Sequence, residues 1–238
     1  MQIFVLDLTV HPLPLFGELP RAGAQIISWL SAELPEADFC SVSVEVDNEG
    51  LPELDSFDGL IVSGSEHGVY DNRPWMAPLR NLLLETKKAG KPIYGICFGH
   101  QMMADTFGGK AEKSQIGNVV GVRQFDFNTK LSNTYVWHKD QVTRVPPEAQ
   151  VTAKAEYCAV GALSYDFPAK SVQFHPEYTE AHLRKMFERS VDYFLTSEEA
   201  DAAIASFKNV NIDKESFATA AANFFRLHSK NITCYSLK

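Results

Sequence analysis

Hydrophobic and polar positions form a regular series of blocks over the first 110 residues of the chain. Short apolar runs alternate with longer stretches in which apolar residues recur at helical spacing. The runs predict strands at residues 3–8, 39–46, 60–63 and 93–96, and the stretches between them predict helices at 21–34 and 78–88. Strands that alternate with helices favour a parallel sheet with helices on both faces.

The pattern changes after residue 110, where short β-rich runs follow one another with no helical stretch between them. These runs lie at 119–127, 134–137, 151–155 and 160–165. A last buried strand is predicted at 171–174, followed by helices at 180–195, 198–208 and 214–228. We therefore expect an α/β fold: a flavodoxin-like, open and mostly parallel sheet with helices on both faces and an antiparallel β extension.

Length and charge narrow the classes of function. The 238 residues suit one large α/β domain, and the sequence has no internal repeat, low-complexity tract or interdomain linker. Asp and Glu total 30 against 22 Lys and Arg, which gives a net charge of −8. Because no uniform basic field exists to attract phosphates or anionic lipid, we expect neither nucleic acid nor a membrane as a partner.

The N-terminus and the cysteines indicate the compartment. The first residues lack a basic segment and meet an acid at Asp7, and no apolar run approaches the ~20 residues of a spanning helix. Cys40, Cys97, Cys158 and Cys234 are widely scattered with no Cys-x-x-Cys pair, which argues against a zinc knot and a disulfide framework. We expect a cytoplasmic protein with a free thiol at Cys97.

Cys97 is the candidate nucleophile. It stands between Gly95 and Gly99, where the apolar run 93–96 turns into a helix. Glycines at both second neighbours let strand and helix approach closely, and a helix N-terminus favours a thiolate. A buried cysteine in an ordinary strand-to-helix junction would give the same pattern, so a partner base is needed.

His175 and Glu177 match the requirements for that base and its orienting acid. A cysteine nucleophile needs a base or cation, and a histidine base needs a third group that fixes its tautomer. Residues two apart in an extended segment point to the same side, so the sequence His-Pro-Glu at a strand end can place both side chains in one site. Taken alone, this tripeptide is also compatible with a capping histidine followed by a solvated acid.

Taken together, the motifs resemble the class I, triad-type glutamine amidotransferase family. They are segment 95–101 (GICFGHQ), segment 174–177 (FHPE) and the Ser63-Gly64 loop at a strand end. The resemblance is closest to guanylate synthase-type glutaminase domains and to stand-alone γ-glutamyl peptidase-like members. It covers about residues 1–195, which we take as the amidotransferase-like domain, and residues 196–238 are expected to form a C-terminal helical extension packed on it.

The resemblance implies a chemistry for each catalytic residue. Cys97 attacks the side-chain amide of glutamine, His175 assists thiolate formation and protonates the leaving ammonia, and Glu177 orients His175. A γ-glutamyl thioester forms and water then hydrolyses it. Oxyanion donors are expected at the backbone N–H groups of Phe98 and Ser65.

The family also implies residues that bind the substrate. Gln101 lies one helical turn beyond Cys97 and is expected to meet the amino-acid end of the substrate. Segment 137–142 (WHKDQV) resembles the family's Ser-His-Gly-Asp-x-Val loop, so His138 and Asp140 are expected to help hold the α-amino and α-carboxylate groups, with Lys139 in place of the usual glycine. Gly64 is expected to border the same site. A polar loop between strands is the alternative interpretation of this segment.

We expect no catalytic metal and no cofactor, because the sequence has neither residues at metal-ligand spacing nor a phosphate-binding loop.

The leading hypothesis is hydrolysis of glutamine with release of ammonia to a separate synthetase subunit. A stand-alone γ-glutamyl peptidase acting on γ-glutamyl peptides or amines is the alternative, and a non-catalytic binding module on the same fold is a minor one. Apolar side chains of the last helix are expected to cover the sheet; they are Phe217, Phe224, Phe225 and Leu227.

Overall fold

The protein, seen here in a computed structural model, is described over residues 1–128 and 130–229. Cys234 and the end of the predicted C-terminal extension lie outside these residues. The strands of the main sheet are β1 (Gln2–Asp7), β2 (Asp38–Ser43), β3 (Gly59–Val62), β4 (Ile93–Ile96), β6 (Val119–Asp126), β7 (Leu131–His138), β9 (Ala149–Ala155), β10 (Cys158–Tyr165) and β11 (Ala169–Val172).

Strand order confirms the predicted fold class. Within the described ranges the sheet has nine strands in the order β2-β1-β3-β4-β11-β10-β9-β6-β7. The first five pair in parallel and follow the flavodoxin-like order, and the remaining strands pair antiparallel as the extension. A second, two-stranded sheet joins β5 (Lys110–Lys113) to β8 (Asp140–Arg144).

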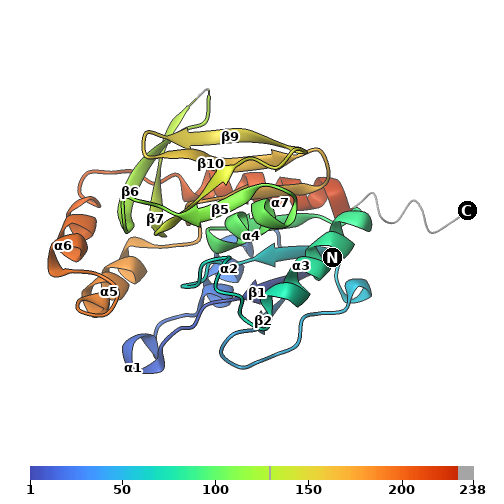
Figure 1. Cartoon of the computed structure of the whole chain (residues 1–238), viewed down its shortest axis with the longest axis horizontal. Helices are drawn as coiled ribbons and strands as arrows, with labels where there is room; N and C mark the ends of the chain where they lie inside the picture. The colour runs from blue at the N-terminus through green and yellow to red at the C-terminus, as the bar shows by residue number, and fades with distance from the viewer. Residues whose placement is uncertain (129, 230–238) are drawn as a thin grey trace, which may run out of the picture.

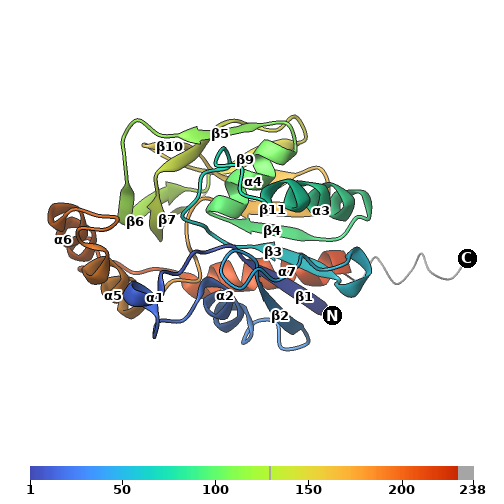
Figure 2. The same cartoon turned by 60° about the horizontal axis from the view of Figure 1, so that its bottom comes forward.

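Helices cover both faces of the parallel strands, as Figures 1 and 2 show. The helices are α1 (Leu13–Phe16), α2 (Ala22–Leu30), α3 (Met76–Lys88), α4 (Phe98–Thr106), α5 (Glu180–Ser190), α6 (Ser197–Ala205) and α7 (Lys214–Ser229), with a 3-10 turn at Leu54–Ser56. In Figure 2, α3 and α4 lie on one face of the sheet, and α2 and α7 lie on the other.

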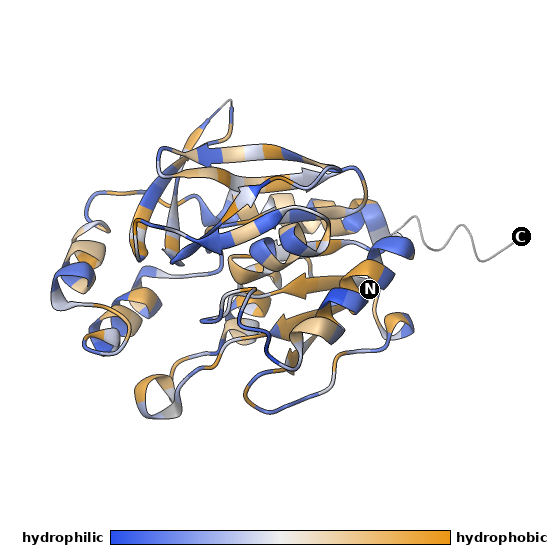
Figure 3. Ribbon diagram, in the orientation of Figure 1, coloured by the Kyte–Doolittle hydropathy of each residue, from blue (hydrophilic) through white to orange (hydrophobic). Residues whose placement is uncertain are grey.

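Burial follows the apolar pattern of the sequence. The central strands β3 and β4 are buried throughout, and Figure 3 shows hydrophobic colouring along the central strands with hydrophilic patches on the outer helices. On the α7 side, Phe224 and Phe225 pack against Tyr94 and Phe217 packs against Phe174, as predicted, whereas Leu227 is 65% exposed. Leu227 therefore does not cover the sheet.

Three local predictions differ from the structure. The helix expected at 180–195 ends at Ser190, because residues 191–195 form a turn closed by a bridge between Val191 and Leu195. Segment 137–142 is not a loop: β7 ends at His138 and β8 begins at Asp140. The short helix α1 and the strand β5 were not predicted, because neither contains enough residues to show a period.

No helix in residues 1–128 and 130–229 is long and apolar enough to cross a membrane.

Candidate active site

Three neighbouring parallel strands carry the candidate catalytic segments to one edge of the sheet. β3 ends immediately before Ser63, β4 ends immediately before Cys97, and β11 ends three residues before His175. β4 pairs with both β3 and β11. The carboxyl ends of such strands are where open α/β sheets bind ligands.

Cys97 has a strained backbone conformation at the start of α4. Its φ is 51° and its ψ is −102°, a region that non-glycine residues rarely adopt. The turn depends on its flanking glycines. A Cβ on Gly99 would lie 2.2 Å from the Val62 carbonyl oxygen, and one on Gly95 would lie 2.5 Å from Met103 Sδ and 2.8 Å from the Gly99 carbonyl. This close strand–helix approach presents the side chain between β4 and α4.

His175 is held by Glu177. Nδ1 of His175 lies 2.7 Å from Oε1 of Glu177, and both residues are 3% exposed. Burial opposes the imidazolium charge, but the Glu177 carboxylate and the neighbouring Cys97 outweigh it, so the pKa of His175 is raised above its usual value. A histidine oriented by an acid next to a cysteine is the arrangement expected of a base and its nucleophile.

Cys97 and His175 flank the same glycine. A Cβ on Gly64 would lie 3.1 Å from His175 Cε1 and 3.7 Å from Cys97 Cβ. His175 Nε2 is buried and has no hydrogen-bond partner among the described residues. The Cys97 thiol lies 3.6 Å from the Trp137 carbonyl oxygen, and Gln173 Nε2 lies 3.7 Å from its sulfur. The structure therefore brings the three predicted catalytic residues together around a free imidazole nitrogen.

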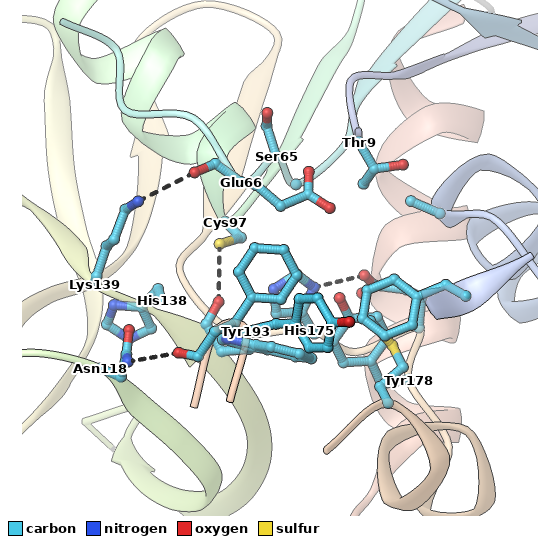
Figure 4. A pocket seen from close by; sticks show the side chains of 17 residues that line it. Thr9, Ser65, Glu66, Cys97, Asn118, His138, Lys139, His175, Tyr178 and Tyr193 are labelled. Atoms are coloured by element: carbon cyan, nitrogen blue, oxygen red, sulfur yellow. Dashed lines mark hydrogen bonds and ion pairs between the residues drawn. The ribbon is translucent and has the colours of Figure 1, made fainter. Parts of the chain in front are cut away.

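A cavity of about 330 Å³ opens over Cys97. Figure 4 shows Cys97 between two sides of this cavity. We call one the polar side, formed by His138 and Lys139, and the other the apolar side, formed by Phe16, Ala22 and Met186, which also share an adjoining hollow with Tyr178. Phe194 stacks on Phe16, and its carbonyl accepts from Asn118 Nδ2 at 3.1 Å, so these two residues connect the two sides. Tyr178, which also lines the cavity, stacks on His175 with ring centroids 4.1 Å apart and an interplanar angle of 7°.

One of the two expected oxyanion donors, Ser65, borders this cavity, and the other, Phe98, directly follows Cys97. Ser65 lines the cavity beside Gly64. Phe98 is the first residue of α4, so its N–H has no acceptor within the helix. By contrast, the Gly99 N–H donates to the Ser63 carbonyl at 3.0 Å, and the Gln101 N–H donates to the Cys97 carbonyl at 3.1 Å.

Of the predicted substrate-binding side chains, His138 faces the cavity, and Gln101 and Asp140 lie behind its wall. Gln101 Nε2 donates to the Asp140 carbonyl at 2.9 Å and to Gln173 Oε1 at 3.1 Å. The Asp140 carboxylate accepts from the Tyr70 hydroxyl at 3.1 Å. Both side chains thus support the corner where β7 ends at His138 and β8 begins at Asp140, which we call the β7–β8 corner.

His138 is held as a neutral ring. Nδ1 of His138 lies 3.0 Å from the Asp140 carbonyl oxygen, and Nε2 lies 3.2 Å from the Tyr157 hydroxyl. Burial lowers the pKa of His138 to about 4. His100, by contrast, is fully buried, and its ring nitrogens lie 2.8 Å from Ser171 Oγ and 3.1 Å from the Val160 carbonyl oxygen.

Several residues of the site were missed by sequence reasoning. Tyr178 follows Glu177 directly, and Gln173 precedes His175 by two, so the same-side rule for extended segments offered a signal for Gln173. Glu66 and Lys214 gave no signal. Lys214, at the start of α7, donates to the Glu177 carbonyl at 3.2 Å, which ties the C-terminal helix to the candidate acid.

No group of three or more His, Cys, Asp or Glu side chains with metal-binding placement occurs in the described part of the chain.

Comparison with known proteins gives the family of this fold and site. The family described as glutamine amidotransferase class-I matches residues 19–192. The chain belongs to this family. A solved glutamine amidotransferase from Thermotoga maritima superposes with a TM-score of 0.76 over 97% of this chain and 98% of its own, at 16% identity, which shows the shared fold.

Two kinds of relative within the family match the sequence. Gamma-glutamyl peptidase 5 of Arabidopsis thaliana is 27% identical over 195 residues, which are 76% of this chain and 78% of that protein. The glutamine-hydrolyzing GMP synthase of Limosilactobacillus reuteri is 30% identical over 167 residues, which are 66% of this chain but only 31% of that protein. The chain thus spans most of the peptidase and about a third of the synthase.

Proposed function

We propose that this member of the class-I amidotransferase family hydrolyses γ-glutamyl amide bonds with Cys97 as nucleophile, His175 as acid and base, and Glu177 as the orienting acid. The observation that carries the proposal is the convergence of a strained, strand-end cysteine with a buried His–Glu pair whose Nε2 is free. This is the geometry expected for an activated nucleophile and its base.

In the first half of the reaction, the Cys97 sulfur attacks the γ-carbonyl carbon, and the proton of the Cys97 thiol passes to His175. The N–H groups of Ser65 and Phe98 stabilise the tetrahedral oxyanion. His175 then protonates the leaving nitrogen, the C–N bond breaks, and a γ-glutamyl thioester remains on Cys97. In the second half, His175 removes a proton from water, which attacks the thioester and releases glutamate and the free thiol.

The polar side of the cavity is proposed to hold the glutamyl part of the substrate. Lys139 supplies a cation for the α-carboxylate. Gln101 and Asp140 act from behind by fixing the β7–β8 corner rather than by direct contact.

We place the stand-alone γ-glutamyl peptidase or amine hydrolase ahead of the glutaminase subunit. Its support is the cavity, which continues past Cys97 along apolar side chains that ammonia would not need, and the similar length of the peptidase relative. A glutaminase that supplies a separate synthetase is the second candidate, and the 30% identity to a glutamine-hydrolyzing GMP synthase favours it. The free thiols of Cys40, Cys97 and Cys158 accord with a cytoplasmic location.

A release assay on the isolated protein separates the two candidates. The peptidase candidate predicts rapid release of amine or peptide from γ-glutamyl compounds without a partner, and slower release of ammonia from free glutamine. Ammonia release from glutamine alone, weak until a synthetase is added, would favour the glutaminase subunit. Turnover of either substrate by Cys97→Ala at the wild-type rate would refute the assignment of the nucleophile.

A further inference from the structure

The cavity over Cys97 is divided by charge as well as by polarity. Lys139 stands on the polar side, whereas the acid on the other side is Glu66 (Figure 4). The second acid that lines the cavity, Glu177, is engaged by His175. Glu66 thus supplies the acidic side chain of the apolar side, and burial raises the pKa of its carboxyl group.

The Glu66 side chain is fixed in place. Its Oε2 accepts from the Val10 N–H at 2.7 Å, and Figure 4 shows its carboxylate pointing toward Thr9, away from Lys139. Only its backbone carbonyl meets Lys139, whose Nζ donates to it at 3.2 Å. Glu66 also borders a smaller adjoining hollow of about 20 Å³, which it shares with Phe16, Ala22 and Met186. The carboxylate therefore belongs to the apolar side and is not neutralised by Lys139.

Aromatic rings extend the apolar side to the mouth of the cavity. Phe16 is buried and stacks with Phe194 at a centroid distance of 6.4 Å and an angle of 23°. Tyr193, beside Phe194, also lines the cavity and is 75% exposed. These rings come from α1 and from the turn after α5, and they offer a planar group apolar contact within the cavity.

The reaction itself assigns the two sides to the two halves of the substrate. If Lys139 takes the α-carboxylate of the glutamyl half, the group leaving from the γ-carbonyl lies on the apolar side. A carboxylate on that leaving group would face the Glu66 carboxyl among apolar walls. Burial already raises the pKa of Glu66, so a second carboxyl charge beside it is disfavoured for the same reason and by repulsion. An uncharged apolar group would find contact instead.

We propose that the preferred substrates are γ-glutamyl amides of apolar, preferably aromatic, amines that carry no carboxylate, and that Glu66 is the residue that disfavours γ-glutamyl amino acids. This inference rests on the proposed function. Water and the amide give glutamate and the free amine: the C–N bond breaks, a C–O bond forms, and the amine nitrogen gains the proton through His175.

The test compares two compounds that differ by one carboxylate, γ-glutamyl-2-phenylethylamide and γ-glutamylphenylalanine. We expect wild-type kcat/KM to favour the first by about tenfold or more. Glu66→Gln, which keeps the shape and removes the charge, is expected to shrink this preference mainly by raising kcat/KM for γ-glutamylphenylalanine. Glu53→Gln, an exposed acid outside the cavity, serves as the control and is expected to leave the preference unchanged.

A second variant tests the aromatic wall. Phe194→Ala is expected to lower kcat/KM for γ-glutamyl-2-phenylethylamide more than it lowers that for free glutamine. The inference is overturned if the wild type prefers γ-glutamylphenylalanine, or if Glu66→Gln leaves the ratio as it was. If neither amide nor glutamine acylates Cys97, the proposed function itself fails.

Discussion

The charge on His175 depends on two neighbours, Glu177 and Cys97, and it links the site to the stability of the fold. Because the pKa of His175 is raised in the folded state, the native protein binds more protons than the unfolded chain above pH ~6.5. This stabilisation is fully present below that pH and is lost as the pH rises through the folded-state pKa.

We therefore expect the free energy of unfolding to fall with rising pH more steeply in the wild type than in His175→Gln, by up to about 1.4 kcal/mol per pH unit. Urea unfolding at a series of pH values above ~6.5 measures the two slopes. The buried histidines with lowered pKa, His100 and His138, are present in both proteins and serve as an internal control. Equal slopes would contradict the raised pKa.

At the residue scale, the sequence identified those side chains whose chemistry requires a particular neighbour. Cys97 needs flanking glycines, and His175 needs an acid two residues away, so both left local patterns. Glu66 and Lys214 act through contacts between segments far apart in sequence, so no local pattern marks them. Tyr178 lies only three residues from His175, but its stacking on that ring depends on the folded backbone. The sequence also pointed to Gln101 and Asp140. It did not predict that the Gln101 side chain donates to the Asp140 carbonyl, because that contact depends on how β7 joins β8.

At the element scale, the junction of β4 and α4 depends on the missing side chains of two glycines. Gly99→Ala would place a Cβ 2.2 Å from a backbone oxygen that cannot move independently of β3. We expect a loss of about 1–3 kcal/mol or more in the free energy of unfolding, as for other overpacked sites. Gly50→Ala is the matched control, because a Cβ there meets nothing within 4 Å. Equal stability of the two variants in urea unfolding would refute this account of the turn.

Helix α7 offers a second prediction at this scale. Phe225 is fully buried against Tyr94, whereas Leu227 on the same helix is 65% exposed. Phe225→Ala is expected to cost about 3–5 kcal/mol in unfolding free energy, and Leu227→Ala less than ~0.5 kcal/mol. Thermal and urea unfolding give both values. A small cost for Phe225→Ala would contradict the packing of α7 on the domain core.

The boundary between α5 and α6 was not predicted by the apolar pattern of the sequence. The apolar period continues through Leu195, so a helix to that residue was a reasonable prediction, but Asp192 adopts φ 66° and Thr196 begins a capping box for α6. These cap contacts end one helix and start another within a few residues. The resulting turn carries Tyr193 and Phe194 to the cavity mouth.

At the scale of the whole molecule, alternation of strand and helix was sufficient to predict the parallel half of the sheet, because right-handed crossovers leave few topologies. It did not predict the order of the antiparallel strands, in which β6 lies between β7 and β9. That order is set by long-range pairing. It nevertheless brings His138 and Lys139 to the same cavity as Phe16 of α1 and Met186 of α5, so the shape of the cavity is a property of the complete fold.

The central claim is that Cys97 becomes acylated by the γ-glutamyl group. Rapid quenching in acid followed by mass spectrometry of the intact protein tests it most directly, with γ-glutamyl-2-phenylethylamide and free glutamine as substrates. We predict a mass increase of one γ-glutamyl group on the wild type, mapped to the peptide that contains Cys97 and absent from Cys97→Ala. Substrate turnover with no acyl group on Cys97, or with the group on another residue, would contradict the account.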